Sequence, residues 1–363
     1  MTKLRGALSQ IQGRFERAER APFDDGWVEG EKEEDLPPPL ATSVTEERAR
    51  SIISRNASPD IPFEQSINPY RGCEHGCIYC YARPSHAYLE LSPGLDFETR
   101  LFAKTNAVEL LQAELSKKGY VAKPIAFGTN TDVYQPIERR YKVMRGILEV
   151  MSACDHPLTI VTKSALIERD IDLLAPMAKK NLVKAFISIT TLDHRLARTL
   201  EPRAASPKRR VDAIKALADA GIPCGVMVAP LIPALTDKSL EAVMEAGAKA
   251  GATMAGWILL RLPNEVRPLF KEWLAAHHPQ RADHVISIIR QSRGGRENDP
   301  NFGSRMTGSG NFVDLIGKRF DLACRRLGLN SEDNHMASRK GLDCALFRPP
   351  SVKQNPAGQM QLF

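Results

Sequence analysis

Short apolar runs alternate with longer amphipathic stretches through the middle of the chain, from about residue 66 onward. Brief runs that are apolar throughout are typical of strands buried on both faces of a parallel sheet, and the middle four of six strand candidates have this character. The six candidates are Ser66–Tyr70, Pro124–Thr129, Leu158–Thr162, Val183–Thr190, Pro223–Ala229 and Thr253–Leu260.

Helix candidates lie between these strands. Asn106–Lys117 carries apolar residues at helical spacing, and Gly221 ends a later helix just before the next strand. The other helix candidates are Ile137–Ala153, Glu168–Lys179, Pro207–Ala220 and Lys238–Ala250. Six β-α units in this order predict an α/β fold, a partial (β/α)6 TIM-like barrel whose chemistry gathers at the carboxyl ends of the strands.

The N-terminal part of the chain has a different composition. An acidic block at Glu29–Asp35 and the run Pro37-Pro38-Pro39 predict a poorly ordered segment over residues 1–60, because such a composition buries little apolar surface. Thr45–Ser54 is a short helix candidate within this segment.

The remaining boundaries follow from the strand and helix patterns. We expect the barrel over residues 61–265, a helical C-terminal extension over 266–348 and a loose tail over 349–363. The extension contains two amphipathic helix candidates and a Gly-rich loop between them, at Arg281–Arg293, Phe312–Leu327 and Gly294–Gly310.

Composition and charge restrict where the protein acts and which partners it has. The 363 residues are 43% hydrophobic, and no apolar run has the length of a membrane helix. The first twenty residues lack the apolar core of a signal peptide, so we expect a cytoplasmic protein with no membrane partner. The formal net charge of +7 is a mild excess, which permits a nucleic-acid partner without requiring one.

Three of the seven cysteines, Cys73, Cys77 and Cys80, stand in a C-x3-C-x2-C motif directly after the first strand candidate. Gly72 and Gly76 let the backbone fold tightly around a compact ligand. A secreted disulfide scaffold would be shorter and denser in cysteine. Three neighbouring thiolates therefore predict a soft metal centre.

A zinc site and a chance grouping of structural cysteines are the alternatives. Structural zinc takes four protein ligands, and no second CxxC or HxxxH pair follows, while His75 and His86 lack the usual spacing. A cubane cluster held by three cysteines has one iron without a protein ligand, as a cofactor-binding cluster requires.

The motif and its surroundings resemble a known family. C-x3-C-x2-C with an aromatic residue, Tyr79, before the third cysteine resembles the radical S-adenosylmethionine (SAM) superfamily. Three segments are similar to sequences of the branch that contains spore photoproduct lyase and related DNA repair proteins. They are NPYRGCEHGCIYCYAR, LDFETRLFAKTNA and GTNTDVYQPIE. The resemblance covers roughly residues 55–345.

This resemblance implies two cofactors and a first reaction step. Cys73, Cys77 and Cys80 would hold a [4Fe-4S] cluster, and the cluster would cleave SAM reductively so that hydrogen is abstracted from a substrate. The substrate is not identified, and a nucleic-acid lesion or base in a lyase-like repair reaction is a candidate. An external one-electron donor such as flavodoxin or ferredoxin would supply the electron.

The resemblance also implies a SAM site built from strand ends. Thr129 and Asn130 follow the second strand, Lys163 ends the third, and Ser188 with Thr190 lies on one face of the fourth. Alternatives from the residues themselves are an Asn/Asp turn, an exposed lysine and a locally satisfied hydroxyl. The SAM-binding candidates are Tyr79, Thr129, Asn130, Lys163, Ser188 and Arg203.

Further residues are expected to face the substrate, although none is assigned a catalytic role. They are Asp132, Tyr134, Gln135 and Arg261. Glu201 is expected to contact a ribose or to orient Arg203, with a surface ion pair as the alternative. Photoproduct lyase has a hydrogen-donor cysteine near its second strand end, whereas Phe127–Asp132 contains none. We therefore expect chemistry that differs from that of the lyase.

Basic residues gather in three segments that could contact phosphates, Arg203–Arg210, Arg290–Arg296 and Lys318–Arg326. No recognised nucleic-acid module accompanies them. An iron-sulfur protein with an electron-transfer, sensing or scaffold role and no SAM turnover is the alternative function. The three-cysteine motif favours the enzyme, because electron carriers usually saturate the cluster with cysteine.

Overall fold

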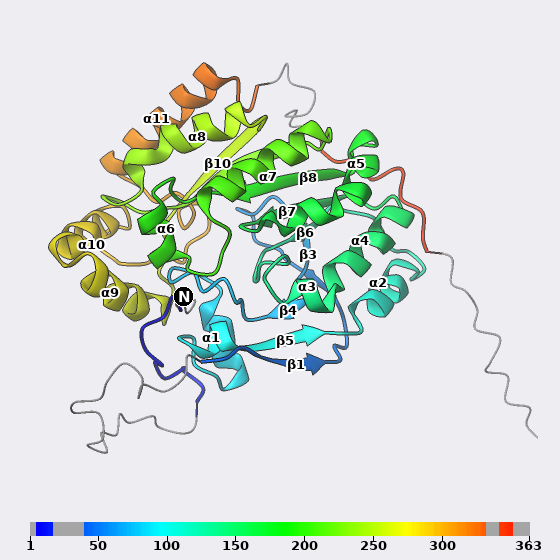
Figure 1. The fold of residues 1–363 in the computed structure, drawn as a ribbon, viewed down its shortest axis with the longest axis horizontal. Helices are drawn as coiled ribbons and strands as arrows, with labels where there is room; N and C mark the ends of the chain where they lie inside the picture. Colours follow the sequence, from blue (N-terminus) through cyan, green and yellow to red (C-terminus); the bar gives the residue numbers. More distant parts are fainter. Residues whose placement is uncertain (1–4, 17–39, 332–340, 351–363) are drawn as a thin grey trace, which may run out of the picture.

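The computed structural model describes residues 5–16, 40–331 and 341–350. Its central feature is a seven-stranded sheet with the strand order β10-β9-β8-β7-β6-β3-β2 (Figure 1). The strands are β2 (Ile53–Arg55), β3 (Gln65–Ile67), β6 (Ile125–Phe127), β7 (Leu158–Thr162), β8 (Val183–Ser188), β9 (Cys224–Leu231) and β10 (Met254–Leu259). The strands from β3 to β10 pair in parallel and β2 joins β3 antiparallel, which confirms the predicted α/β fold as an open, partial barrel.

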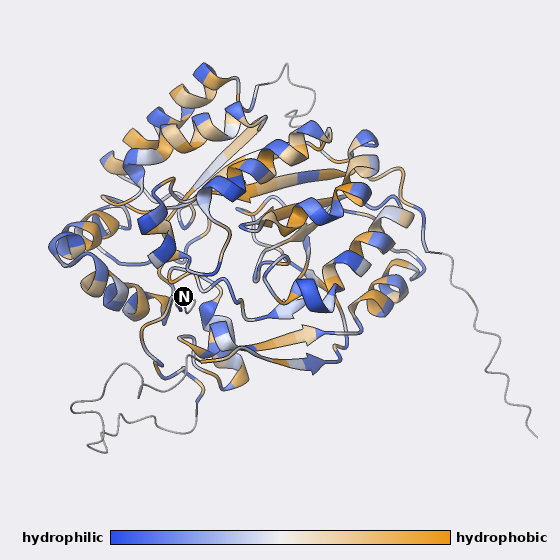
Figure 2. Cartoon of the chain, viewed as in Figure 1, coloured by the Kyte–Doolittle hydropathy of each residue, from blue (hydrophilic) through white to orange (hydrophobic). Residues whose placement is uncertain are grey.

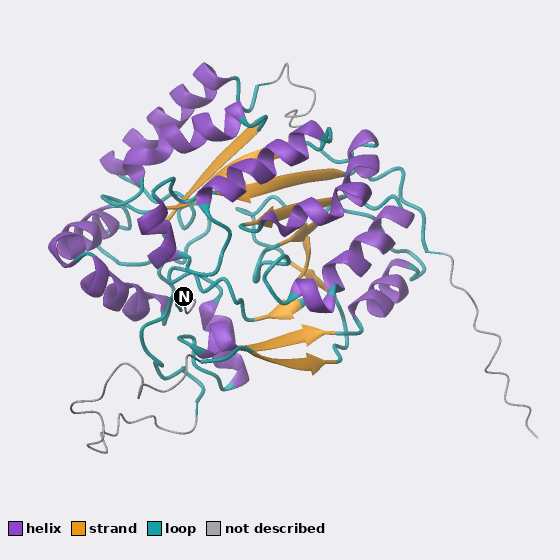
Figure 3. Ribbon diagram, viewed as in Figure 1, coloured by secondary structure: helices purple, strands orange, loops and turns teal. Residues whose placement is uncertain are grey.

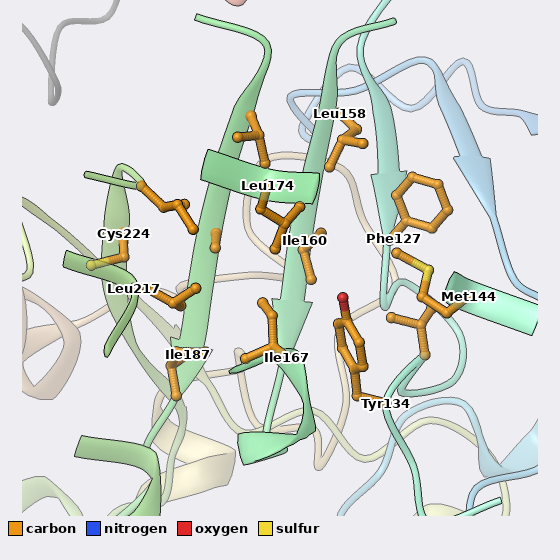
Figure 4. Packing of buried hydrophobic residues seen from close by; sticks show 14 of the residues in the cluster. Phe127, Tyr134, Met144, Leu158, Ile160, Ile167, Leu174, Ile187, Leu217 and Cys224 are labelled. Atoms are coloured by element: carbon orange, nitrogen blue, oxygen red, sulfur yellow. The ribbon is translucent and has the colours of Figure 1, made fainter. Parts of the chain in front are cut away.

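Helices cover one side of this sheet, and the core lies between the two layers (Figure 3). They are α2 (Ala107–Leu115), α3 (Glu138–Tyr141), α4 (Val143–Ala153), α5 (Ile171–Lys179), α7 (Pro207–Asp219) and α8 (Leu240–Lys249). Ile160 and Ile187 on the strands lie in one buried cluster with Leu174 and Leu217 on the helices (Figure 4). The strands are mostly hydrophobic, while the helices turn hydrophilic residues outward (Figure 2).

Two predicted helices are interrupted. Ile137–Ala153 divides into α3 and α4 at Lys142, which has a positive φ of 51°. The candidate at Glu168–Lys179 begins instead as a 3-10 helix over Ala165–Asp170 and continues as α5.

The first predicted strand, Ser66–Tyr70, is also divided. Its strand geometry ends at Ile67, and Tyr70–Arg71 forms β4 in a different sheet. Proline has no N–H to donate, so Pro69 cannot continue the ladder. This division places the cysteine motif after β4, between the two sheets.

A small three-stranded sheet, with the order β1-β5-β4, was not predicted. It joins β1 (Ser43–Glu47) in parallel to β5 (Arg100–Lys104), which pairs antiparallel with β4. The predicted helix over Thr45–Ser54 is therefore wrong, because this pairing overrides local helix propensity. Within the segment predicted to be poorly ordered, residues 5–16 and 40–60 have defined contacts. The acidic block and the proline run lie outside the described residues.

The chain after the sheet is mostly helical, with α9 (Val266–His277), α10 (Ala282–Gln291) and α11 (Asn311–Leu327). A second buried cluster holds α9 and α10 together through Phe270, Trp273 and Ile289. Shorter elements complete the described fold, at η1 (Arg83–Leu89), α1 (Asp96–Thr99), η2 (Ala165–Asp170), α6 (His194–Leu200), η3 (Asp237–Ser239) and η4 (Pro279–Arg281). None of the helices in the described ranges is long and apolar enough to cross a membrane.

A buried histidine makes the stability of the fold dependent on pH. His156 Nδ1 lies 3.0 Å from the Pro157 carbonyl oxygen and Nε2 lies 2.8 Å from the Tyr120 hydroxyl. Burial lowers the pKa of His156 to about 4. The unfolded chain binds the proton more readily, so stability is complete above the usual histidine pKa and falls as the pH drops towards 4.

We expect the lowered pKa of His156 to reduce the free energy of unfolding by about 3 kcal/mol as the pH falls from 7 to 4. Urea denaturation of the wild type and of His156→Gln over that range measures it. The free energy of unfolding, plotted against pH, should fall more steeply for the wild type than for the variant. Parallel plots would contradict the role of His156.

Candidate cofactor site at the carboxyl ends of the strands

The cysteine loop follows β4 and lies beside the carboxyl ends of the parallel strands. Cys73 and Cys77 are buried and Cys80 is partly exposed, and all three are free thiols. Gly72 and Gly76 have positive φ angles of 73° and 68°, in the region that favours glycine. Tight backbone bonds, such as Cys80 N–H to the Cys77 carbonyl at 3.2 Å, shape the loop.

The thiols of this loop are close enough to act on one another. Burial raises the pKa of Cys73, and Asp132, Cys77 and Cys80 raise it further. Burial, with the Glu201 carboxylate, raises the pKa of Cys77 to about 12. Such thiols keep their protons unless a metal centre supplies positive charge, because coordination deprotonates a thiol. Three free cysteines on one loop are a donor set that fits a metal centre binding several thiolates.

A single metal ion and a cubane cluster require different arrangements of their ligands. Among the described residues, no group of three or more His, Cys, Asp or Glu side chains converges on a position for a single metal ion. A mononuclear zinc site requires such convergence, whereas each cysteine that holds a cubane binds a different iron.

A buried polar network supports the loop from the strand side. The Tyr79 hydroxyl donates to Glu201, and Thr190 Oγ1 donates to the same carboxylate oxygen at 2.6 Å. Arg210 from α7 pairs with the other oxygen and donates to the Ser188 carbonyl at 3.0 Å. Burial opposes ionisation of Glu201, yet Arg210 and Lys163 lower its pKa to about 2. A charged carboxylate thus fixes the Tyr79 ring.

Asp132 joins the second and third strand ends. Its carboxylate accepts hydrogen bonds from Thr162 Oγ1 at 2.7 Å and from the Lys163 N–H at 2.8 Å. His75 from the cysteine loop lies 3.4 Å away. Burial raises the pKa of Asp132, but His75 and these hydrogen bonds outweigh it and lower the pKa to about 2. The carboxylate therefore fixes the backbone next to Lys163.

The strand end at Thr129 is fixed by Asn68 and Tyr81. Asn68 Oδ1 accepts the Asn130 N–H at 2.9 Å, and Asn68 Nδ2 donates to Thr129 Oγ1 at 3.1 Å. The Tyr81 hydroxyl donates to the Thr129 carbonyl. Since Tyr81 follows Cys80, this contact ties the second strand end to the cysteine loop.

Comparison with known proteins identifies the family. Residues 67–247, which include the cysteine loop and these strand ends, match the family model of the radical SAM superfamily. The chain belongs to the radical SAM superfamily. Radical SAM proteins use a [4Fe-4S] cluster and SAM, and these are its cofactors.

Relatives of this radical SAM protein occur in bacteria and archaea. An uncharacterized protein of Mycobacterium bovis is 40% identical over 233 residues, which is 64% of this chain and 68% of that protein. An uncharacterized protein of Methanocaldococcus jannaschii is 31% identical over 171 residues, 47% of this chain and 61% of the other. A structure of spore photoproduct lyase complexed with dinucleoside spore photoproduct has a TM-score of 0.56 and 17% identity, covering 79% of this chain and 80% of that one. It shares the fold of this chain.

The structure brings most of the predicted SAM-binding residues of this radical SAM protein to one region. Lys163 Nζ lies 5.7 Å from the centroid of the Tyr79 ring. Ser188 is buried at the end of β8. Arg203 pairs with Glu74 of the cysteine loop, and its backbone N–H donates to the His75 carbonyl at 3.2 Å. The expected partnership of Glu201 with Arg203 is therefore wrong, because Glu201 pairs with Arg210.

Three residues expected to face the substrate of this radical SAM protein have structural contacts instead. Tyr134 is buried in the main core (Figure 4). Gln135 is buried below the cysteine loop, where it accepts the Glu74 N–H at 2.8 Å and donates to the Gly72 carbonyl at 3.1 Å. Asp132 is likewise occupied by hydrogen bonds. The pattern of hydrophobic and polar residues around these positions did not predict that their side chains point into the protein.

Sequence reasoning missed two arginines that support the radical SAM site. Arg83 is buried after the third cysteine and donates to the Cys77 carbonyl at 2.9 Å. Arg210 lies in a segment read as a basic surface, although its guanidinium is buried. The position of Arg83, three residues after Cys80, is a signal in the sequence that could have indicated its role. No local signal distinguishes Arg210 from its exposed neighbours Lys208 and Arg209.

Proposed function

We propose that this protein cleaves SAM reductively at a [4Fe-4S] cluster held by Cys73, Cys77 and Cys80 and abstracts hydrogen from a substrate. The observation that carries the proposal is the loop with three free cysteines beside the polar ends of the parallel strands. When bound and reduced, the cluster and SAM together supply a 5′-deoxyadenosyl radical.

The residues of the chain would bind and orient SAM. We assign this role to Tyr79, Thr129, Asn130, Lys163, Ser188 and Arg203. Lys163 offers a compact positive charge for a carboxylate, and Thr129 with Asn130 offers hydroxyl and amide groups. Support comes from the fixed backbone at these positions, since Asp132 holds Lys163 and Asn68 holds Asn130.

The buried network would hold the aromatic ring beside the cluster. Tyr79, between Cys77 and Cys80, is fixed by Glu201, and Glu201 is fixed by Arg210. A preorganised ring needs no rearrangement when SAM binds, which favours productive alignment. All three side chains are buried, so water does not compete for the hydrogen bonds that hold the ring.

The experiment that tests this function is anaerobic reconstitution with iron and sulfide, followed by SAM and dithionite. Formation of 5′-deoxyadenosine, measured by liquid chromatography, supports the enzyme. A reduced cluster that leaves SAM intact would support the electron-transfer, sensing or scaffold role instead.

For the substrate, we propose a nucleic-acid lesion or base. The shared fold with spore photoproduct lyase supports this class, and so does Arg261, which follows β10. Its guanidinium stands 5.7 Å from the Tyr81 ring centroid, and Nη1 contacts Met306 Sδ at 3.8 Å. Its Nε is buried without a hydrogen-bond partner among the described residues. This guanidinium would bind an anionic group such as a phosphate.

Several of the basic side chains predicted to contact phosphates are engaged within the chain. Arg209 pairs with Glu168, Arg290 with Glu297 and Arg319 with Glu241. Arg293 is buried against backbone carbonyls, including that of Leu260 at 3.0 Å. In contrast to these engaged side chains, Arg261 has a guanidinium nitrogen without a partner among the described residues.

Replacing Arg261 with methionine should weaken DNA binding about tenfold, the value of one hydrogen-bonded charge contact. Titration of a fluorescent oligonucleotide at several salt concentrations measures this, and the slope of log affinity against log salt should fall by about one. Lys208→Gln is the control, because Lys208 is highly exposed and pairs with Asp212. Absence of DNA binding at low salt would contradict the nucleic-acid proposal.

A further inference from the structure

Residues 5–16, here called the N-terminal strap, lie against the cysteine loop. Gly6 packs so closely that a Cβ there would overlap the Gly76 carbonyl oxygen, between Cys73 and Cys77. Ala7 is buried in one apolar cluster with Cys77 and Ile78. The strap therefore packs directly against the loop backbone at Gly76.

Glu98 connects the strap to the loop. Its carboxylate is fully buried in α1 and accepts the Gly6 N–H at 2.9 Å and the Ala7 N–H at 2.8 Å. Arg83 donates to the same carboxylate at 2.5 Å and also to the Cys77 carbonyl. A Cβ on Gly76 would come within 2.7 Å of Glu98 Oε2. One carboxylate thus contacts the strap, the loop and the arginine that supports the loop.

The far end of the strap is bound to the C-terminal helices. Ser9 Oγ donates to Glu272 of α9 at 2.7 Å, and Arg14 pairs with Glu265 at 2.6 Å. Figure 1 shows the dark blue N-terminal segment passing α1 and α9. The strap is therefore anchored in two different parts of the fold, at Glu98 of α1 and at Glu265 and Glu272 of the C-terminal region.

We propose that the N-terminal strap is the outer wall of the cluster site, and that Glu98 is the positioning residue that holds this wall against the cysteine loop. The role rests on the proposed function, because it requires a cluster at Cys73, Cys77 and Cys80. Excluding water matters to such a cluster in two ways. It slows the loss of iron, and it keeps the reduction potential low, since water stabilises the more highly charged reduced form.

Gly6→Ala tests the wall without altering Glu98. In the full-length, anaerobically reconstituted protein, the added methyl group should separate the strap from Gly76. We expect amide hydrogen exchange in residues 5–8 and 73–80 and iron loss to a chelator to become about tenfold faster or more, as for loss of one hydrogen bond to a charged group. The midpoint potential should become less negative.

Two further variants complete the experiment. Glu98→Gln keeps the shape of the side chain but removes its charge. Amide hydrogen exchange and iron loss should again become faster, and the midpoint potential should again become less negative. Leu8→Ala is the matched control, because the Leu8 side chain is on the strap but 46% exposed. It should change the rates by no more than about twofold, as surface substitutions do. Far-UV circular dichroism confirms that each variant is folded.

The outcomes separate this inference from the proposed function. A wild-type chain that takes up no cluster would overturn the proposed function and the role of the strap together. A wild-type chain that holds the cluster, with unchanged iron loss and potential in a folded Gly6→Ala variant, would overturn the strap alone.

Discussion

Replacing Cys77 with serine is expected to remove the cluster and abolish SAM cleavage. Removing an outer-shell partner of a metal ligand already costs about 10- to 100-fold in metal affinity or activity, and removing a ligand costs more. A serine hydroxyl is a poor donor to iron in this setting because it is harder than a thiolate. Iron and sulfide content after anaerobic reconstitution, with the visible spectrum, measures the loss.

The other loop cysteines, Cys73 and Cys80, should give the same result when replaced. Cys344 provides the control, because it is a partly exposed cysteine far from the motif in sequence. Cys344→Ser should retain iron and 5′-deoxyadenosine formation. Full iron content in Cys77→Ser, or equal losses in Cys344→Ser, would contradict the assignment of the ligands.

Replacing Arg210 with methionine should destabilise the protein by about 3–5 kcal/mol, because it leaves the Glu201 carboxylate buried without its cation. The loss should extend to the cluster, since Glu201 fixes Tyr79 within the cysteine motif. Anaerobic urea denaturation gives the stability and iron analysis gives the cluster content. Lys215→Met is the matched control on α7, where the exposed Lys215–Asp219 pair contributes at most about 1 kcal/mol.

A double variant separates the two effects of Arg210. Glu201→Gln combined with Arg210→Met removes both charges, so much of the stability should return. Tyr79 would still lack its anionic acceptor, and SAM cleavage should remain low. Stability unchanged in Arg210→Met would contradict the buried pair.

The sequence predicted the central strands of the sheet well because they are short apolar runs with at least one buried face. Leu158–Thr162 and Val183–Ser188 read as apolar runs at almost the bounds that the structure shows. The position of the cysteine loop also followed from the sequence, since a motif after the first strand of such a sheet falls among the strand ends. Local patterns were sufficient for both.

The contacts that complete the site could not be predicted, because they join residues far apart in the chain. Gly6 and Glu98 are separated by 92 positions, and nothing in the composition near Gly6 indicates a buried segment. Arg210 is one of several adjacent basic residues, and only the fold buries its guanidinium. The helix expected at Thr45–Ser54 failed for the same reason, since pairing with β5 determines that conformation.

The central claim is that three cysteine ligands leave one iron free for SAM. Mössbauer spectroscopy of the cluster rebuilt with isotopically enriched iron, with and without SAM, tests it most directly. The account predicts that one iron site changes its isomer shift when SAM is added, while the others stay as they were. Identical spectra from a cluster with all its irons bound by protein side chains would contradict it.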